Sequence, residues 1–216
     1  MKYGLGYALI TSITGFLSRT IFYFRRTELN YILNLIKNDD SKILDFGCNT
    51  GYFANMIKKR NPKSEVYGAD INKFALNYAR KRYKDIQFFN INERFYKNYK
   101  FDIIVLSHVL EHVKNPKKLI KNISKLLNKN GLLIIAIPQE RIRGDTTIFQ
   151  LLYNLLLLRF ENPHVIKLNY EDCNNILTKS RFAILDHIYT NYFLPFETNI
   201  KKFYSWSLII TARKMN

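Results

Sequence analysis

Hydrophobic and polar residues follow one another along the chain in a regular order of strand-like and helix-like segments. Short apolar runs predict buried strands, and stretches with an apolar residue every three or four positions predict helices. Strands are expected at 41–47, 64–70, 86–92, 101–107 and 132–138, and helices at 27–37, 52–60, 72–83 and 115–127. A helix at 170–180 and strands at 181–189 and 206–214 follow. Alternating strands and helices predict an open parallel sheet with helices on both faces.

Three local signals place boundaries within this pattern. Thr27 is expected to cap the first of these helices and Asn72 the helix at 72–83, because both side chains can accept hydrogen bonds from free amides at a helix start. Asn130-Gly131 predicts a turn before the strand at 132–138. The chain of 216 residues shows no internal repeat or low-complexity linker, which favours a single domain.

The N-terminal residues 3–24 are apolar enough to raise the question of a membrane span. They include Arg19 and three glycines, and no small-residue cleavage site follows, so neither a span nor a signal peptide is expected. The apolar residues fall at helical spacing instead: Leu9, Ile13, Phe16, Leu17, Ile21 and Phe24. We therefore expect an amphipathic helical segment at residues 1–26 and the main domain at 27–216. Periodicity leaves open whether this helix contacts membrane, substrate or core.

Composition and charge narrow the class of protein. A hydrophobic content of 47% excludes a disordered chain. The net charge of +17 suits nucleic acid or an anionic membrane, but the lysines are scattered, and AT-rich coding would give the same Lys, Asn, Ile and Tyr bias. Only Cys48 and Cys173 occur, so no disulfide framework is expected and the cytoplasm is the expected location, with peripheral membrane contact left open.

The stretch ILDFGCNTGYFA, at residues 43–54, suggests a ligand site. Asp45 can accept hydrogen bonds from loop amides or a ligand ammonium, and Gly47 and Gly51 allow the backbone to approach a ligand closely. The next strand ends in Asp70, at the spacing at which an acid binds ribose hydroxyls in nucleotide-binding units. The loop lacks the third glycine of dinucleotide-binding loops, and its acid disfavours a pyrophosphate. A cationic cofactor with an amino-acid tail fits better, which points to S-adenosylmethionine.

Four segments in order resemble the motifs of class I S-adenosylmethionine-dependent methyltransferases: ILDFGCNTGYFA, VYGADIN, FDIIVLSHVLEHVKNP and LLNKNGLLIIAIP. The resemblance covers about residues 27–138, and the tail to residue 214 is similar to the closing strand pair of that family. It implies a Rossmann-like, doubly wound sheet that is mostly parallel with an antiparallel last strand. It also implies S-adenosyl-L-methionine as the cofactor.

The resemblance assigns cofactor-binding roles to residues at the ends of the strands. Asn49 stands where the family loop has its middle glycine, and asparagine is the non-glycine residue that most readily adopts a left-handed backbone. The loop is therefore expected to keep its shape. The full implied set is Asp45, Gly47, Cys48, Asn49 and Gly51 around the methionine part, Asp70 and Ile71 at the ribose, Asn92 (with Asn90 as the alternative register) at the adenine, and Ser107 and His108 at the reactive end.

Histidines that could act as a base follow the strand at 101–107. Methyl transfer needs a base only if the acceptor must lose a proton. His108, His112 and His164 are the candidate bases, and each can instead be purely structural. Residues 108–112 also spell the H-x-x-E-H signature of inverted zinc proteases. Asn115-Pro116 follows so closely that a helix holding both histidines would be at most about two turns long, and no metal site is expected.

The acceptor is expected to be a small, hydrophobic or lipid-like molecule. The Asn- or Asp-Pro-Pro-aromatic turn that accompanies adenine methylation in this superfamily is missing after the strand at 101–107. Methylation of a base at C5 needs a cysteine nucleophile near that strand, and Cys173 lies far from it in the sequence. In the resembling family the acceptor pocket is covered by the N-terminal segment and by insertions after the fifth strand and before the last. Here these segments are apolar or aromatic. An RNA methyltransferase and a non-catalytic S-adenosylmethionine-binding protein are the alternatives.

Overall fold

The computed structural model describes residues 24–37, 40–93, 99–139, 164–191, 197–202 and 205–215. The helix expected at 3–24 and most of the expected acceptor-covering segments therefore lie outside the described residues. The boundary expected between residues 26 and 27 stays a prediction, although one helix runs across it. Among the described residues, no helix is both long and apolar enough to cross a membrane.

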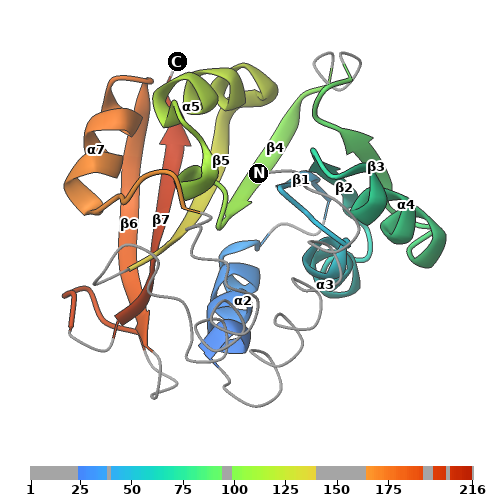
Figure 1. Ribbon diagram of the computed structural model, residues 1–216, viewed down its shortest axis with the longest axis horizontal. Coiled ribbons are helices and arrows are strands. Elements are labelled where there is room, and N and C mark those ends of the chain that lie inside the picture. The colour runs from blue at the N-terminus through green and yellow to red at the C-terminus, as the bar shows by residue number, and fades with distance from the viewer. Residues whose placement is uncertain are drawn as a thin grey trace, which may run out of the picture.

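The described elements follow the alternation expected from the sequence (Figure 1). The strands are β1 Lys42–Phe46, β2 Glu65–Asp70, β3 Gln87–Asn90, β4 Phe101–Ser107, β5 Leu127–Pro138, β6 Phe182–Asn191 and β7 Ser205–Lys214. The helices are α2 Phe24–Leu35, α3 Tyr52–Arg60, α4 Lys73–Arg82, α5 Pro116–Leu126 and α7 Tyr170–Thr178, with a short 3-10 helix η2 at Leu110–His112.

All seven strands form one sheet in the order β3-β2-β1-β4-β5-β7-β6. The pairs from β3 to β5 are parallel, and β7 runs antiparallel to both β5 and β6. This confirms the Rossmann-like sheet that is mostly parallel with an antiparallel last strand. The strand order reverses beside β1, and the carboxyl ends of β1 and β4 meet at that point, where α/β sheets bind their ligands.

Helices cover both faces of the sheet, each over its own apolar core. Residues of α2, α3 and α4 pack with one set of strand side chains, and residues of α5 and α7 pack with the other. In β4 the alternation is direct: Ile103 and Val105 face the first core, and Ile104 and Leu106 face the second. Burial on both faces explains why this strand reads as a continuous apolar run.

Two boundaries differ from the sequence expectation, and one is confirmed. The Asn72 side chain accepts hydrogen bonds from the amides of Phe74 and Ala75, as expected of a cap. Thr27 is not a cap, because α2 already begins at Phe24 and an ion pair between Arg25 and Glu28 spans its first turn.

The turn expected at Asn130-Gly131 is absorbed into β5. Asn130 has a φ of 59°, and the pairing with β4 shifts register between Phe101 and Ile103, so the strand continues through an irregularity instead of beginning after a turn. Asparagine supplies the left-handed conformation that this irregularity needs.

Candidate active site

The loop after β1 is bound to the end of β2 by backbone groups. The amides of Gly47 and Cys48 both donate to the carbonyl of Ala69, at 2.7 and 3.0 Å. The carboxylate of Asp70 accepts hydrogen bonds from the backbone amides of Asn49, at 2.7 Å, and Asn72, at 2.8 Å. Asp70 therefore shapes the loop, and its two oxygens still have lone pairs for further donors.

Three loop residues have left-handed backbones: Gly47 with φ 89°, Asn49 with φ 47° and Gly51 with φ 76°. The expectation that Asn49 keeps the loop shape of a glycine is confirmed. Gly47 has a second constraint, because a Cβ there would lie 2.4 Å from Cγ2 of Val109. The loop thus presents backbone, with little side-chain bulk, at the carboxyl edge of the sheet.

Asp45 is a buried carboxylate behind this loop. Its Oδ2 has no hydrogen-bond partner among the described residues. Its pKa is raised to about 7, mainly by burial and in part by the charge of Asp70, while Arg25 and a hydrogen bond from the backbone of Ala54 act in the opposite direction. A carboxylate held in this way favours a cationic partner.

Cys48 is a buried thiol in the same loop. Burial raises its pKa well above the ordinary value, and the charges of Asp45 and Asp70 add to this effect. It therefore contributes bulk to the loop and no thiolate. A cysteine there packs close to Gly68, where an added Cβ would lie 2.9 Å from its sulfur.

The residues expected at the adenine lie at the end of β3. Asn90 is buried, donates to the carbonyl of Ile71 at 3.2 Å and accepts the amide of Asn92 at 3.0 Å. Asn92 is exposed, and Ile71 is 46% exposed beside Asp70. Asn90 thus positions the turn, and Asn92 keeps an accessible side chain. We call the residues from Asp45 to Gly51 together with Asp70–Asn72 the cofactor half of the site.

These residues fit S-adenosylmethionine in charge and shape. Asp45 offers a buried, unpaired carboxylate oxygen to a cation, and Asp70 can accept hydroxyl protons beside an exposed apolar residue, Ile71. The left-handed glycines leave room for close approach.

A second group of polar side chains gathers beyond the end of β4. Glu28 of α2 is fully buried, and its Oε2 accepts hydrogen bonds from Nε2 of His108 and Nε1 of Trp206, both at 2.9 Å. Its other oxygen accepts a hydrogen bond from Arg25. Burial opposes ionisation, but the charges of Arg25 and His108 outweigh it and lower the pKa of Glu28 to about 2.

His108 is held as a cation. Burial favours its neutral form, but the charge of Glu28 outweighs burial and raises the pKa of His108 to about 9. Its Nδ1 lies 3.4 Å from Oε1 of Glu111, so both ring nitrogens face carboxylates. Its φ of 56° turns the chain sharply out of β4. In this state it has no lone pair with which to take a proton.

Arg25 connects the two groups. Its Nη2 donates to the hydroxyl of Ser107 at 3.0 Å, its Nη1 pairs with Glu28, and its charge acts on Asp45. Ser107, expected at the reactive end of the cofactor, is thus bound to α2.

His112 and His164 lie against each other, with ring centroids 4.9 Å apart. The carbonyl of Glu111 accepts the amides of Val165 at 2.8 Å and Ile166 at 3.2 Å, which brings His164 beside the turn after β4. Burial lowers the pKa of His164 to about 4. Glu28, His108, Glu111, His112 and His164 form the histidine half of the site. The structure thus brings all three expected histidines together.

Sequence reasoning missed Arg25, Glu28, Glu111 and Trp206 as members of this group. One signal was available for Glu28: it falls four residues before Ile32, on the face of α2 that is otherwise apolar and buried. An acid on such a face needs partners. No comparable signal marks Trp206, which lies 178 residues away from Glu28 in the chain.

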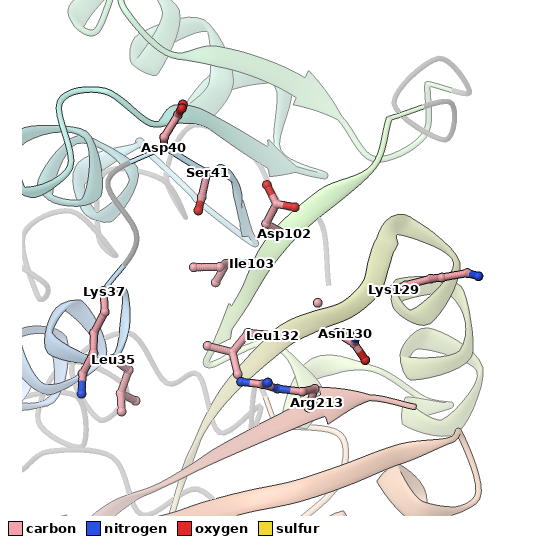
Figure 2. Close-up of a pocket in the computed structure, with 11 residues that line it drawn as sticks. Leu35, Lys37, Asp40, Ser41, Asp102, Ile103, Lys129, Asn130, Leu132 and Arg213 are labelled. Carbon is pink, nitrogen blue, oxygen red and sulfur yellow. The ribbon is translucent and has the colours of Figure 1, made fainter. Parts of the chain in front are cut away.

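A separate pocket of about 550 Å³ lies at the opposite edge of the sheet, where the parallel strands begin (Figure 2). Asp102 lines it, and its carboxylate accepts the amide of Lys42 at 2.9 Å and the side-chain amide of Asn128 at 2.7 Å. The Lys129 side chain points away from the hollow in Figure 2. Ligands of such sheets bind at the carboxyl edge, so this pocket is not the candidate active site.

Comparison with known proteins places the chain in a family. A model of the methyltransferase domain matches residues 18–187. The chain is 31% identical over 116 residues to the ubiquinone biosynthesis O-methyltransferase of Coxiella burnetii, which covers 50% of this chain and 48% of that protein. It is 27% identical over 132 residues to the demethylmenaquinone methyltransferase of Thermotoga maritima, covering 60% of this chain and 55% of that one. The chain thus spans about half the length of these relatives.

The fold agrees with solved structures. Magnesium protoporphyrin IX methyltransferase from Synechocystis PCC 6803, with bound SAH, superposes with a TM-score of 0.61 at 16% identity, over 88% of this chain and 85% of that one. At this identity the likeness concerns the fold alone. Because the family model covers most of the chain, the protein belongs to the methyltransferase domain family, within the class I S-adenosylmethionine-dependent methyltransferases.

Proposed function

We propose that the protein transfers the methyl group of S-adenosylmethionine to a small, hydrophobic or lipid-like acceptor. The observation that carries the proposal is the unpaired buried carboxylate of Asp45, placed behind a left-handed loop and one strand away from Asp70. This arrangement suits a ligand with a cationic tail and ribose hydroxyls. The cofactor, when bound, supplies an activated methyl group.

The chain's own residues then have separate tasks. Asp45 and Asp70 hold and orient the cofactor, and orientation supplies much of the rate of a transfer between two bound molecules. His108 is committed to Glu28 and Glu111 as a cation, so it stabilises developing negative charge better than it removes a proton. If the acceptor must lose a proton, the group formed by Glu111, His112 and His164 is the place where it is taken up, because this group lies beside His108 in the turn after β4.

The acceptor class rests on the relatives. Those described above are named for ubiquinone and menaquinone synthesis, whose acceptors are quinone-type molecules. A lipid-like acceptor would bring the protein to a membrane surface, and the net charge of +17 favours an anionic one. A cytoplasmic protein with peripheral membrane contact is therefore part of the proposal. The apolar segments expected to cover the acceptor remain predictions.

A labelled-methyl transfer assay into fractionated cell extract tests the function. The purified chain is incubated with labelled S-adenosylmethionine, and label is counted in lipid, RNA, protein and small-solute fractions. We expect label in the lipid or small-solute fraction, lost in Asp70→Ala and kept in the matched variant Asp102→Ala at the far edge of the sheet. Label in RNA would establish the RNA alternative. Cofactor binding without label in any fraction would establish the non-catalytic one.

A further inference from the structure

Glu111, His112 and His164 converge at the turn after β4. Each offers one ligand atom, and these atoms all lie within 4.8 Å of one another. The convergence is built by the backbone, because the carbonyl of Glu111 accepts two amides from the residues that follow His164. Two segments separated by about fifty positions therefore contribute to one cluster.

The carboxylate of Glu111 is the unusual member of the cluster. The residue is 2% exposed, and neither carboxylate oxygen accepts a hydrogen bond of ordinary geometry from the described residues. The nearest cationic group, Nδ1 of His108, lies 3.4 Å from Oε1, beyond the usual range for such bonds. A buried carboxylate without donors is strongly destabilising unless a cation neutralises it. His108 is shared with Glu28, which it contacts more closely, at 2.9 Å, so the buried carboxylate of Glu111 can still accept a further positively charged partner.

Two imidazoles and a carboxylate are the ligand set of many transition-metal sites. His₂Glu sets hold catalytic zinc, and two histidines with one carboxylate also hold iron, with positions left open for water or substrate. With bonds of about 2.0 to 2.2 Å in a tetrahedral arrangement, two ligand atoms on one ion are about 3.3 to 3.6 Å apart. Nε2 of His112 lies 4.0 Å from Oε1 of Glu111, and the ligand atoms of the three residues all lie within 4.8 Å of one another. Rotations that move the ligand atoms by less than about 1 Å would close the site.

We propose that Glu111, His112 and His164 form a binding site for a divalent transition-metal ion of the zinc type. This differs from the sequence expectation of no metal. It also differs from the H-x-x-E-H signature, in which both histidines of the motif are ligands. Here His108 is committed to Glu28, and His164, from outside the motif, takes its place. The ion would link residues 164–166 to the turn after β4. Three protein ligands leave coordination positions open for water or substrate.

Zinc titration of the untagged full-length chain tests the site. Zn²⁺ is added to chelator-treated protein in competition with a chromophoric chelator, and bound metal is measured by elemental analysis. We expect one tightly bound ion per chain. Affinity should fall by more than about tenfold in Glu111→Gln and in His164→Gln, since even the partners of metal ligands contribute about 10- to 100-fold. Co²⁺ substitution should give a visible absorption spectrum that both variants lose.

The fourth histidine of the chain provides the matched control. His187, on β6, packs against Tyr170 of α7 and is not a member of the cluster, so His187→Gln should bind zinc as the unchanged protein does. Thermal unfolding and S-adenosylmethionine binding, measured on each variant, separate a lost site from a lost fold. Absence of stoichiometric zinc, or equal affinity in all three variants, would overturn the proposal. Because the readout is metal binding, this result is independent of whether methyl transfer is found.

Discussion

The cofactor half and the histidine half of the site lie at the same edge of the sheet but are built differently. In the cofactor half the polar contacts run largely to backbone amides, such as those of Asn49 and Asn72 on Asp70, and the participating residues come from two consecutive strand-to-helix connections. In the histidine half side chains meet side chains, and Glu28 binds partners 80 and 178 residues away. A short motif can encode the first kind of site, whereas the second exists only once the chain is folded.

The two halves also differ in charge. The cofactor half keeps an acid, Asp45, without a compensating donor on one oxygen, and its pKa is raised by burial. In the histidine half Glu28 pairs with two cations, Arg25 and His108, which lower the pKa of Glu28. The cofactor half is therefore prepared for a cationic ligand, whereas Glu28 in the histidine half is already neutralised by the protein. They touch through Val109, which packs on Gly47.

The largest effect is expected from breaking the histidine half at Glu28. Glu28→Ala leaves His108 and Arg25 without their buried counter-charge, and we expect the free energy of unfolding to fall by about 3 to 5 kcal/mol in urea titration. The exposed Glu171→Ala should lower it by less than about 1 kcal/mol. Glu28→Gln, if folded, should bind S-adenosylmethionine within a few fold of the unchanged protein. A strong loss of cofactor affinity there would show that the two halves are not separable.

Asp45 gives the cofactor half a characteristic pH dependence. The unfolded chain ionises this group near pH 4, whereas the ligand-free folded chain does so at about pH 7, so the folded state binds the additional proton in between. The stability that Asp45 contributes is therefore present below about pH 4 and lost as pH rises through 7.

Asp45→Asn removes this dependence, because the amide does not ionise. The variant should gain stability relative to the unchanged protein as pH rises, reaching about 4 kcal/mol at pH 8 in denaturant titrations, because a shift of about three pKa units corresponds to that free energy. Its affinity for the cationic cofactor should fall at the same pH. A difference in stability between the two proteins that stays constant from pH 4 to 8 would contradict the raised pKa.

Gly47→Ala tests the contact between Gly47 and Val109, where the two halves of the site meet. The variant has a strained left-handed backbone and a methyl group that overlaps Val109, and we expect a loss of about 2 kcal/mol in stability. Adding Val109→Ala should restore the steric part and leave the backbone strain. A double-mutant cycle with Val109→Ala alone measures the two parts. Fully additive losses would mean that the glycine serves the backbone conformation only.

Asp70→Ala addresses the cofactor half directly. Loss of a partly buried acceptor of hydroxyl and amide protons should weaken S-adenosylmethionine binding by about 1 to 3 kcal/mol in calorimetry. Asp102→Ala, which removes a carboxylate with similar amide partners beside the pocket of Figure 2, should lower stability and leave cofactor affinity unchanged. Equal effects of the two variants on affinity would remove Asp70 from the cofactor site.

Much of the fold and of the cofactor half could be predicted from the sequence. Periodicity identified the alternating elements, the spacing of Asp45 and Asp70 indicated a nucleotide-like ligand, and Asn49 was expected to adopt the left-handed backbone that the structure has. These features are local, because they depend on backbone preference and on residues within one strand-to-helix unit. Thr27 shows the limit of local signals. Threonine favours helix caps, but the prediction that Thr27 caps this helix was wrong because α2 begins earlier, at Phe24.

The sequence by itself thus determined the order of elements, the glycine loop and the acids at the ends of β1 and β2. Only the tertiary structure decided that Glu28 pairs with His108, that His108 is a cation, and that His164 lies beside Glu111 and His112. The physical reason is that these properties depend on burial and on charges carried by distant segments. Both are set by how α2, β4, β7 and the chain at 164–166 pack together, which no short window of residues contains.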